Sequence, residues 1–438
     1  MAANIWNKVL QPVIGSLRPR VVDNILRMSS LRSSIELVFV TICCACFGGS
    51  FALGASPAAG KKPGISDADL VVHELCGKRI ALLGESPSHG YGRTLQFKAE
   101  LARRLIDECH YGAFFIESGI YDFLNIQKKL KSGQEVTEPM IAAAIGGLWA
   151  SGEVEPLIPF LLENARAGKV VLGGLDDQLG RGTYAQRAMP SDLVEYLQGD
   201  AKTQCLAILQ KHTLWQYDAK SPYGPKDKAA ILGCLNSVEV AISRTQSSDV
   251  PFRDYDIAMV ESLKRSFARD FQEGVQTDVD LTIRNFNARD ESMYLNFRWA
   301  VSRLPGRSKV ILWGATTHMA KDLSSVPGRE RFVSMGSFIR REFKSQSFAL
   351  GFSAYSGSYG MARQPVRQLN VAPSSSLEGH AFANHDSDTC YLTSSQIRKL
   401  GLVPARPLGP EFQTAKWDKV LDGILLFHEE HPPNFGGQ

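Results

Sequence analysis

The chain has 438 residues, of which 44% are hydrophobic and 21% are charged, so it can bury a substantial core and has an ordinary globular composition. Its formal net charge is +4, but residues 1–58 contribute five Lys or Arg and two Asp or Glu, which leaves about +1 for the rest. A nearly neutral body without basic runs argues against nucleic acid as a partner.

A long uncharged stretch near the N-terminus predicts a targeting segment. Residues 37–60 contain no charged side chain and follow several arginines. A basic region, an apolar run and a tail of small residues are typical of a signal peptide, with Ala55 and Ala58 as candidate cleavage positions. The run is also just long enough to remain as a membrane anchor, which would then be the chain's one contact with a membrane. We therefore predict an exported protein, periplasmic or secreted, whose residues 1–60 are a signal peptide or membrane anchor with an N-terminal extension.

The cysteines leave the pairing question open. Beyond the apolar run there are five, at positions without short paired spacing: Cys76, Cys109, Cys205, Cys234 and Cys390. They match neither a disulfide framework nor a zinc motif. An exported protein is compatible with one or two bridges, and the spacing does not say which cysteines form them.

Four short apolar runs predict buried strands. They are Ile80–Leu83, Ala113–Ile116, Val170–Leu172 and Val310–Trp313. Helical patterns lie between them, over about Asp69–Cys76, Thr94–Glu108, Ile120–Leu130, Glu135–Ile145 and Glu153–Ala167. Strands that alternate with helices predict an α/β fold with a mostly parallel central sheet and flanking helices.

The third and fourth runs are separated by a large, mostly helical insert of about residues 189–305, whose last helix covers about Leu281–Leu304. Further strand-like pieces are expected at Arg331–Met335 and Ser347–Ala354. We expect an α/β domain over residues 61–372 and a C-terminal extension over residues 373–438.

Each predicted strand ends in polar residues. The candidates at these ends are Glu85, His89, Glu117, Asp176, Gln178 and His318. Because the carboxyl ends of parallel strands meet at one edge of a sheet, these side chains are expected to converge on one cleft. Imidazoles and carboxylates together suit hydrolysis, since a carboxylate-oriented histidine takes a proton from water and a second group stabilises the oxyanion.

Other chemistries fit less well. No serine lies in a G-x-S-x-G elbow, so a serine nucleophile is not indicated. Two histidines and two carboxylates would also bind Zn²⁺ or Mn²⁺, but the H-E-x-x-H spacing is absent. We therefore expect no cofactor, with a metal-dependent hydrolase as an alternative. Each residue alone is also compatible with a turn, a helix cap or a solvated helix edge.

Together these stretches resemble the motifs of the erythromycin esterase-like family. The matches are Gly84–Gly90 for G-E-x-x-H-G, Phe115–Glu117 for F/A-x-E, Trp149–Leu157 for W-x-x-x-E-V-x-x-L, Gly174–Gln178 for G-F-D-x-Q, Arg289–Asn296 for R-D-x-x-M-x-x-N, Trp313–His318 for W-A-H-N-x-H, and Met335–Ser337 for M-G-S. The order of these matches along residues 79–355 makes them specific as a set.

Two positions depart from the family pattern. The loop has one residue more than the pattern between Glu85 and His89. In the last motif, Ala315 and Thr316 stand where the pattern has His and Asn. The lost histidine motivates a third reading, a catalytically inactive binding protein that keeps the fold.

The resemblance implies a reaction and roles for the residues. Family members hydrolyse an ester, in the best-known case the macrolactone of erythromycin, without a tightly held metal, which implies macrolide inactivation and antibiotic resistance. His89 would then activate water, Glu117 would hold that imidazole or the water, Glu85 would orient the loop, and His318 would donate to the carbonyl or leaving oxygen. The residues expected to face or support the small-molecule ester or lactone are Arg93, Asp176, Gln178, Arg289 and Asp290.

Overall fold

The computed structural model describes residues 66–436 apart from 219, 246–251, 271–277, 363 and 384–386. The predicted signal peptide or anchor lies outside the described residues. In the part of the chain that is described, no helix has the length and apolar character needed to cross a membrane.

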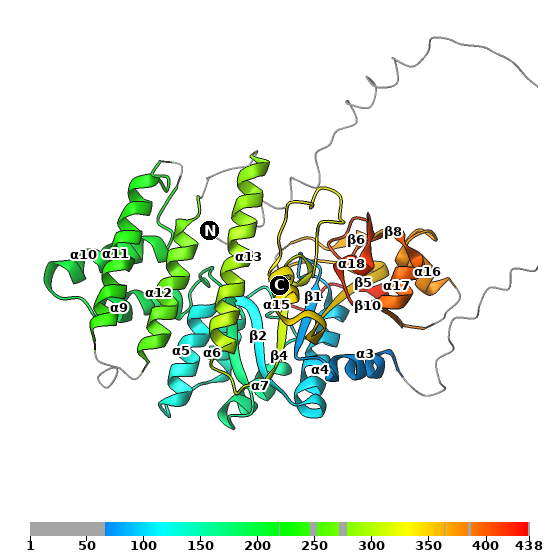
Figure 1. Ribbon diagram of the computed structural model, residues 1–438, viewed down its shortest axis with the longest axis horizontal. Coiled ribbons are helices and arrows are strands. Elements are labelled where there is room, and N and C mark those ends of the chain that lie inside the picture. The colour runs from blue at the N-terminus through cyan, green and yellow to red at the C-terminus, as the bar shows by residue number, and fades with distance from the viewer. Residues whose placement is uncertain are drawn as a thin grey trace, which may run out of the picture. The chain divides into compact units, whose positions relative to one another are not determined.

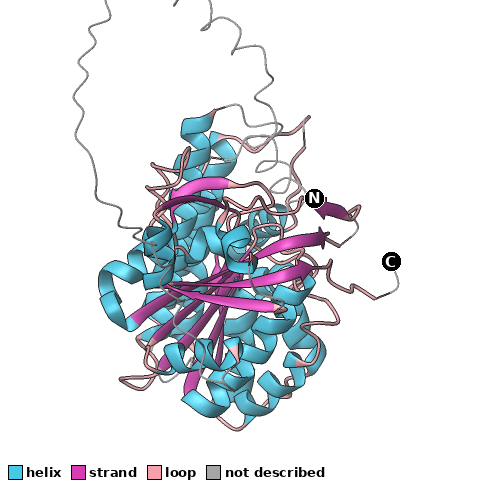
Figure 2. Cartoon of the chain, turned by 90° about the vertical axis from the view of Figure 1, so that its right-hand side faces the viewer, coloured by secondary structure: helices cyan, strands magenta, loops and turns pink. Residues whose placement is uncertain are grey.

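A mostly parallel sheet runs through the centre of the described structure, with helices on both of its sides (Figure 2). Its strands are β1 (Ile80–Glu85), β2 (Tyr111–Gly119), β3 (Val171–Asp176), β4 (Lys309–Ala315), β5 (Ser347–Tyr359), β6 (Arg367–Leu369), β7 (Thr389–Thr393) and β10 (Gly423–Glu430). The order is β3-β2-β4-β1-β5-β10-β7, with β6 paired to β5. All neighbours from β3 to β10 are parallel, whereas β6 and β7 are antiparallel to their partners. The predicted α/β class and all four predicted strands are confirmed.

The apolar runs are continuous because both faces of the sheet are covered. In β1, Ala81 and Leu83 join one core, whereas Ile80 and Leu82 join the core on the opposite face. The first core is shared with helices α3 (Asp67–Cys76), α4 (Gly92–Cys109) and α7 (Leu157–Arg166). The second core is shared with helices α13 (Val279–Val301), α14 (Thr316–Met319) and α15 (Met335–Phe343). The helices that precede the insert are α3 (Asp67–Cys76), α4 (Gly92–Cys109), α5 (Ile120–Lys131), α6 (Glu138–Ile145) and α7 (Leu157–Arg166), as the sequence predicts to within a few residues.

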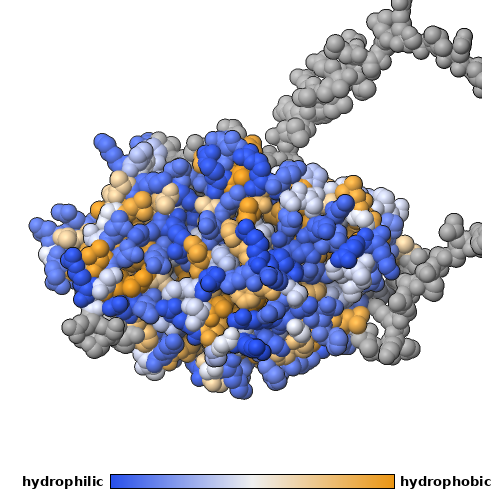
Figure 3. Space-filling view, in the orientation of Figure 1, coloured by the Kyte–Doolittle hydropathy of each residue, from blue (hydrophilic) through white to orange (hydrophobic). Residues whose placement is uncertain are grey.

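The predicted helical insert is confirmed. It contains α9 (Met189–Val194), α10 (Gly199–Thr213), α11 (Pro225–Arg244), α12 (Arg253–Ala268) and α13 (Val279–Val301), after the short α8 (Tyr184–Arg187). Helices α9 to α12 form the green end of the molecule in Figure 1, while α13 returns to the sheet. The residue colours in Figure 3 show small hydrophobic patches scattered over a hydrophilic face, which is ordinary for a globular surface.

The chain after β4 differs from expectation in one place. The prediction of a strand at Arg331–Met335 is wrong, because residues 331–334 are a loop and Met335 begins α15 (Met335–Phe343). Ser334 ends the loop as an N-cap, its side chain accepting a hydrogen bond from the backbone of Ser337. The expected strand at Ser347–Ala354 is β5.

Residues 373–438, predicted as a C-terminal extension, pack on the same sheet. The remaining elements are α14 (Thr316–Met319), η1 (Lys344–Gln346), α16 (Leu377–Phe382), α17 (Ser394–Leu400), β8 (Leu402–Ala405), β9 (Gln413–Lys416) and α18 (Trp417–Val420). Strand β8 pairs with β9 outside the central sheet, whereas β10 lies inside it between β5 and β7. The last strand of the chain is therefore two positions away from β1.

Two disulfides cross-link the described residues. Cys76–Cys109 joins the C-terminal ends of α3 and α4. Cys205–Cys234 joins α10 to α11 within the insert. These bridges answer the pairing question that the spacing leaves open.

Candidate active site

The strand order brings the polar strand ends together. Neighbouring strands β3, β2, β4 and β1 end at Asp176, Gly119, Ala315 and Glu85, so their carboxyl ends share one edge of the sheet. Close packing at this edge depends on Gly314, where an added Cβ would lie 2.7 Å from an oxygen of Glu117. The polar side chains at these strand ends then form two clusters of direct contacts.

We call the first group, made of Glu85, His89, Lys98 and Trp149, the His89 cluster. His89 Nδ1 lies 2.9 Å from Glu85 Oε1, and Trp149 Nε1 donates to the same oxygen at 2.7 Å. The Lys98 ammonium pairs with the other Glu85 oxygen and lies 4.2 Å from the centre of the Trp313 ring. Because an ionised carboxylate only accepts, Nδ1 of His89 carries the proton and Nε2 keeps a lone pair.

The loop that carries His89 explains why Glu85 is its partner. His89 has a φ of 52°, in the left-handed region, and its backbone N–H donates to Ser86 O at 2.8 Å. This turn folds the imidazole back over the end of β1, four residues away. The Thr316 hydroxyl lies 2.8 Å from Gly84 O and 3.0 Å from Glu85 O, which fixes the start of the loop. This turn brings Glu85 and His89 into direct contact.

His89 is neutral at pH 7 in this environment. Burial lowers its pKa to about 4, and the positive charges of His318 and Arg289 act in the same direction, against the opposing charge of Glu117. Burial also holds the pKa of Lys98 well below its usual range. The ring of Trp149 meets the His89 ring edge-on, with centroids 4.9 Å apart, and restricts its rotation.

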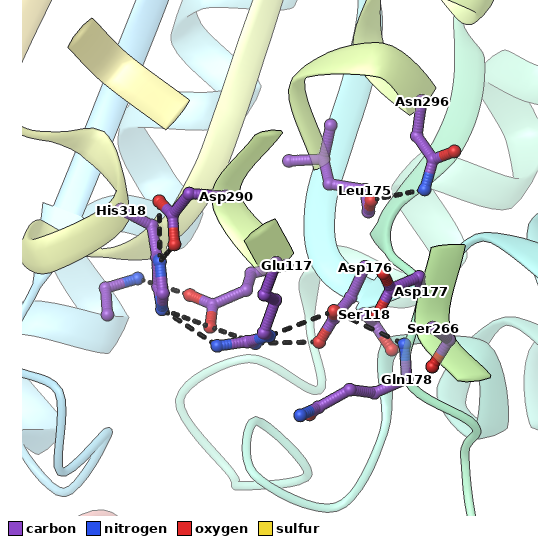
Figure 4. A network of polar contacts seen from close by, with 12 residues as sticks. Glu117, Ser118, Leu175, Asp176, Asp177, Gln178, Ser266, Asp290, Asn296 and His318 are labelled. Carbon is purple, nitrogen blue, oxygen red and sulfur yellow. Dashed lines mark hydrogen bonds and ion pairs between the residues drawn. The ribbon is translucent and has the colours of Figure 1, made fainter. Parts of the chain in front are cut away.

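The second group, the Arg289 cluster, is made of Glu117, Asp176, Arg289, Asp290 and His318. Figure 4 labels four of them, Glu117, Asp176, Asp290 and His318. Arg289 donates through Nε and Nη2 to the two oxygens of Asp176, at 3.1 and 2.7 Å. Its Nη2 also donates to Glu117 Oε1 at 3.0 Å, and Glu117 Oε2 accepts from the backbone N–H of Ala315 at 2.7 Å. One guanidinium therefore joins the ends of β2 and β3.

His318 is held by Asp290 in the same way as His89 is held by Glu85. Its Nδ1 lies 2.8 Å from Asp290 Oδ2, and Asp290 Oδ1 accepts from the backbone of Met335 at 2.7 Å. Its Nε2 lies 3.0 Å from Arg289 Nη1 and 3.3 Å from Glu117 Oε1. Because guanidinium only donates, a neutral His318 accepts from Arg289, whereas a protonated His318 donates to Glu117.

The charges of the Arg289 cluster favour a protonated His318. Burial alone would lower the pKa of this imidazole, but Asp290 and Glu117 raise it above its usual value. Burial alone would raise the pKa of Glu117, but His318, Arg289 and His89 lower it to about 2. The two imidazoles at this sheet edge therefore have pKa values displaced in opposite directions.

The predicted site residues fall into three groups. Glu85, His89, Glu117 and His318 lie in the two clusters, but the hydrogen-bond partner of His89 is Glu85, and Glu117 contacts His318 and Arg289 instead. Asp176, Arg289 and Asp290 belong to the Arg289 cluster and bind one another or His318.

The third group consists of the two remaining predicted residues, Gln178 and Arg93. The backbone N–H of Gln178 donates to Asp176 Oδ1 at 3.3 Å, and its residue is half-buried. Arg93 donates to Glu429 O at 3.2 Å and lies 5.3 Å over the Phe427 ring, so its guanidinium is held at β10.

Sequence reasoning assigned no site role to Lys98, to Trp149 or to the pair of Asp177 and Arg269. Lys98 lies among the apolar positions of α4, three residues from both Leu95 and Leu101, and a lysine on an apolar helix face was the available signal. Asp177, the residue after Asp176, accepts from Nη1 and Nη2 of Arg269 at 2.5 and 2.6 Å. This second buried ion pair ties the insert to the end of β3.

Within residues 66–436, wherever the structure describes them, no group of three or more His, Cys, Asp or Glu side chains could hold a metal ion. The cation between Glu117 and Asp176 is the guanidinium of Arg289.

Comparisons with known proteins identify relatives of this fold and sequence. The family model described as erythromycin esterase matches residues 106–417. The putative hydrolase YbfO of Bacillus subtilis is 22% identical over 331 residues, which are 69% of this chain and 72% of YbfO. A succinoglycan biosynthesis protein superposes with a TM-score of 0.64 at 14% identity, covering 86% of this chain and 94% of the other. A histidine-to-asparagine mutant of the erythromycin esterase EreC, in its open conformation, gives 0.59 at 14% identity, covering 84% and 94%.

Proposed function

We propose that this chain, which belongs to the erythromycin esterase family, is an exported hydrolase that cleaves an ester or lactone with water activated by His89. The family and the Bacillus relative support the hydrolase class. A macrolide lactone is the first substrate to test, since the family takes its name from one.

One observation carries the proposal: two buried imidazoles each have Nδ1 held by a carboxylate of their own. Glu85 holds His89, and Asp290 holds His318. Each ring is fixed in orientation, and each directs Nε2 away from its carboxylate. Histidines anchored in this way serve as general base or general acid.

The two imidazoles suit opposite proton transfers. Neutral His89 takes a proton from water at Nε2, and the water oxygen forms a bond to the carbonyl carbon while the carbonyl π electrons move to its oxygen. Arg289 and protonated His318 supply the positive charge that stabilises this oxyanion. When the carbon–oxygen bond to the leaving group breaks, His318 gives its Nε2 proton to the departing oxygen, and Glu85 stabilises the His89 imidazolium. Pairs of titratable groups whose pKa values are pushed apart are a recurring basis for such a division of roles.

Export is supported by the disulfides. Bridges such as Cys76–Cys109 and Cys205–Cys234 form and persist in oxidising compartments and are rare in the cytosol of mesophiles. This agrees with the leader-like composition of residues 37–60.

The experiment is a hydrolysis screen on the purified protein. Macrolides, simpler lactones and aryl esters are incubated with the parent protein, and products are read by mass as the gain of one water. His89→Asn and His318→Asn should each lower turnover by about 10²–10⁴-fold while the protein remains folded. Metal content and activity after chelation are measured on the same sample, and chelation should leave activity unchanged. Binding without turnover across the whole panel would contradict the proposal and favour a binding protein.

A further inference from the structure

The C-terminal residues Glu430–Asn434 contact both chain segments that hold the His89 cluster. We call them the C-terminal segment. They begin at the end of β10 and lie beyond residue 417, where the match to the family ends. The two segments they contact are the start of α4 and the turn that carries Trp149.

At the first contact, Glu430 caps α4. Its Oε1 accepts from the backbone of Arg93 at 2.6 Å, and its Oε2 accepts from the hydroxyl of Thr94 at 2.9 Å. The next residue, His431, accepts from the backbone N–H of Gly92 at 2.6 Å. The first N–H groups of a helix have no partner within the helix, so this carboxylate satisfies donors that would otherwise be orphaned. Helix α4 begins three residues after His89, and its start sets where the loop ends.

The loop that carries His89 also contacts the end of β5, the neighbour of β10. Gly360 donates to Gly90 O at 3.0 Å, directly after His89. A Cβ added at Gly90 would lie 2.7 Å from Gly360 O, so the backbones approach as closely as they can. The rings of Tyr91 and Tyr359 stack with centroids 5.5 Å apart.

At the second contact, Asn434 binds the Trp149 turn through its backbone. Gly152 donates to Asn434 O at 2.7 Å, and the backbone N–H of Asn434 lies 3.0 Å from both oxygens of Glu153. Trp149 precedes this pair in the same turn, where Ser151 donates to Trp149 O at 2.9 Å. These contacts join only the backbone of Asn434 to Gly152 and to the side chain of Glu153, whereas the Asn434 side chain accepts from the backbone N–H of Gly436 at 3.0 Å.

We propose that the C-terminal segment positions the Glu85–His89 pair by fixing the start of α4 and the Trp149 turn at the same time. The indole of Trp149 and the ring of His89 meet at one oxygen of Glu85, so both segments must be placed correctly for that meeting. Residues Glu430, Asn434 and Glu153 act through others and are positioning residues. The inference rests on the proposed function for its kinetic consequence, but its structural consequence can be measured without any substrate.

The structural test compares the full chain with chains that end at Pro433 and at Gly436. The chain ending at Gly436 keeps Asn434 and is the matched control, as is Asn434→Ala, which keeps the backbone contacts. The readout is the indole N–H resonance of Trp149 in a ¹⁵N spectrum, assigned with Trp149→Phe. Ending the chain at Pro433 should shift or broaden this resonance, and both controls should leave it in place.

The kinetic test uses whichever ester or lactone the screen identifies. The chain ending at Pro433 should lose on the order of 10- to 100-fold in kcat with little change in KM, because a misplaced general base slows chemistry more than binding. Glu153→Gln, which keeps one acceptor for Asn434, should show the same split with a smaller loss and keeps the test open if the shorter chain does not fold. A Trp149 resonance unchanged by ending the chain at Pro433 or by Glu153→Gln would overturn the inference. If the parent shows no turnover, the proposed function fails, and the resonance still decides the role of the segment.

Discussion

The two clusters at the sheet edge are built differently. In the His89 cluster, Glu85 and His89 are four residues apart on one loop, and Lys98 follows on the next helix. In the Arg289 cluster, Glu117 and Arg289 are 172 residues apart, and Arg289 lies on the last helix of the insert. Both clusters nevertheless present an imidazole whose Nδ1 is held by a buried carboxylate.

The surroundings of the two imidazoles shift their pKa values in opposite directions. Around His89, burial is the dominant influence and lowers the pKa to about 4, so the ring is neutral at pH 7. Around His318, two carboxylates outweigh burial and raise the pKa. In the proposed mechanism, the same anchoring therefore serves a base where burial dominates and an acid where two carboxylates outweigh burial.

Removal of each imidazole in turn tests whether the two histidines have different roles. His89→Asn and His318→Asn should each lower kcat by about 10²–10⁴-fold, the usual contribution of a general base or acid. Profiles of kcat/KM against pH separate them. Loss of His89 should remove the acid limb, because the activity falls there as the base becomes protonated. Loss of His318 should remove the alkaline limb, because the activity falls there as the acid loses its proton. If both variants kept both limbs, the assignment of roles would be wrong.

Removal of the cation tests how the distant cluster is held together. Arg289→Met leaves the carboxylates of Glu117 and Asp176 buried without their shared partner, so the free energy of unfolding should fall by about 3–5 kcal/mol. Arg298→Met is the control on the same helix, because its pair with Glu342 is solvent-exposed and should contribute less than about 1 kcal/mol. Urea unfolding measures both. Equal losses would mean that the buried cluster contributes no more than a surface pair.

Acid stability tests the neutral state of His89. Its folded-state pKa is below its unfolded value of 6.5, so the unfolded chain binds the proton more readily as pH falls. The free energy of unfolding should therefore decrease by about 3 kcal/mol between pH 6.5 and 4 because of this group alone. The slope of the unfolding free energy against pH in this window should be smaller in His89→Asn than in the parent. Parallel slopes would contradict the low pKa.

The smallest expected effect concerns the orientation of His89. Trp149→Phe keeps an aromatic edge against the imidazole but removes the donor to Glu85, a charge-assisted hydrogen bond of about 1.5–3 kcal/mol. We expect a modest loss of stability and a decrease in kcat that is smaller than for His89→Asn. Thermal unfolding and steady-state kinetics on one preparation give both values. A loss of kcat as large as that of His89→Asn would assign Trp149 a larger role than positioning.

Much of the fold and of the site could be predicted because local sequence encodes it. Apolar runs such as Ile80–Leu83 that stop at glycines predict buried strands, and parallel strands place their carboxyl ends together. That reasoning led from the printed sequence to Glu85, Glu117, Asp176 and His318.

The remaining features depend on geometry that one-dimensional patterns do not carry. One such feature is the left-handed backbone conformation of His89, which places the imidazole against Glu85 and not against Glu117. Lys98 lies at a core position of the helical period of α4, but its residue type alone would assign it to the surface. The placement of β10 beside β5, and with it the C-terminal segment, follows from long-range strand order.

The most direct test of the central claim is an NMR titration of the imidazole rings of His89 and His318, each assigned by its Asn variant. The account predicts that His89 titrates near pH 4 and that His318 titrates above 6.5, its ordinary value. Two rings that titrate together near 6.5, or in the reverse order, would contradict the division into base and acid.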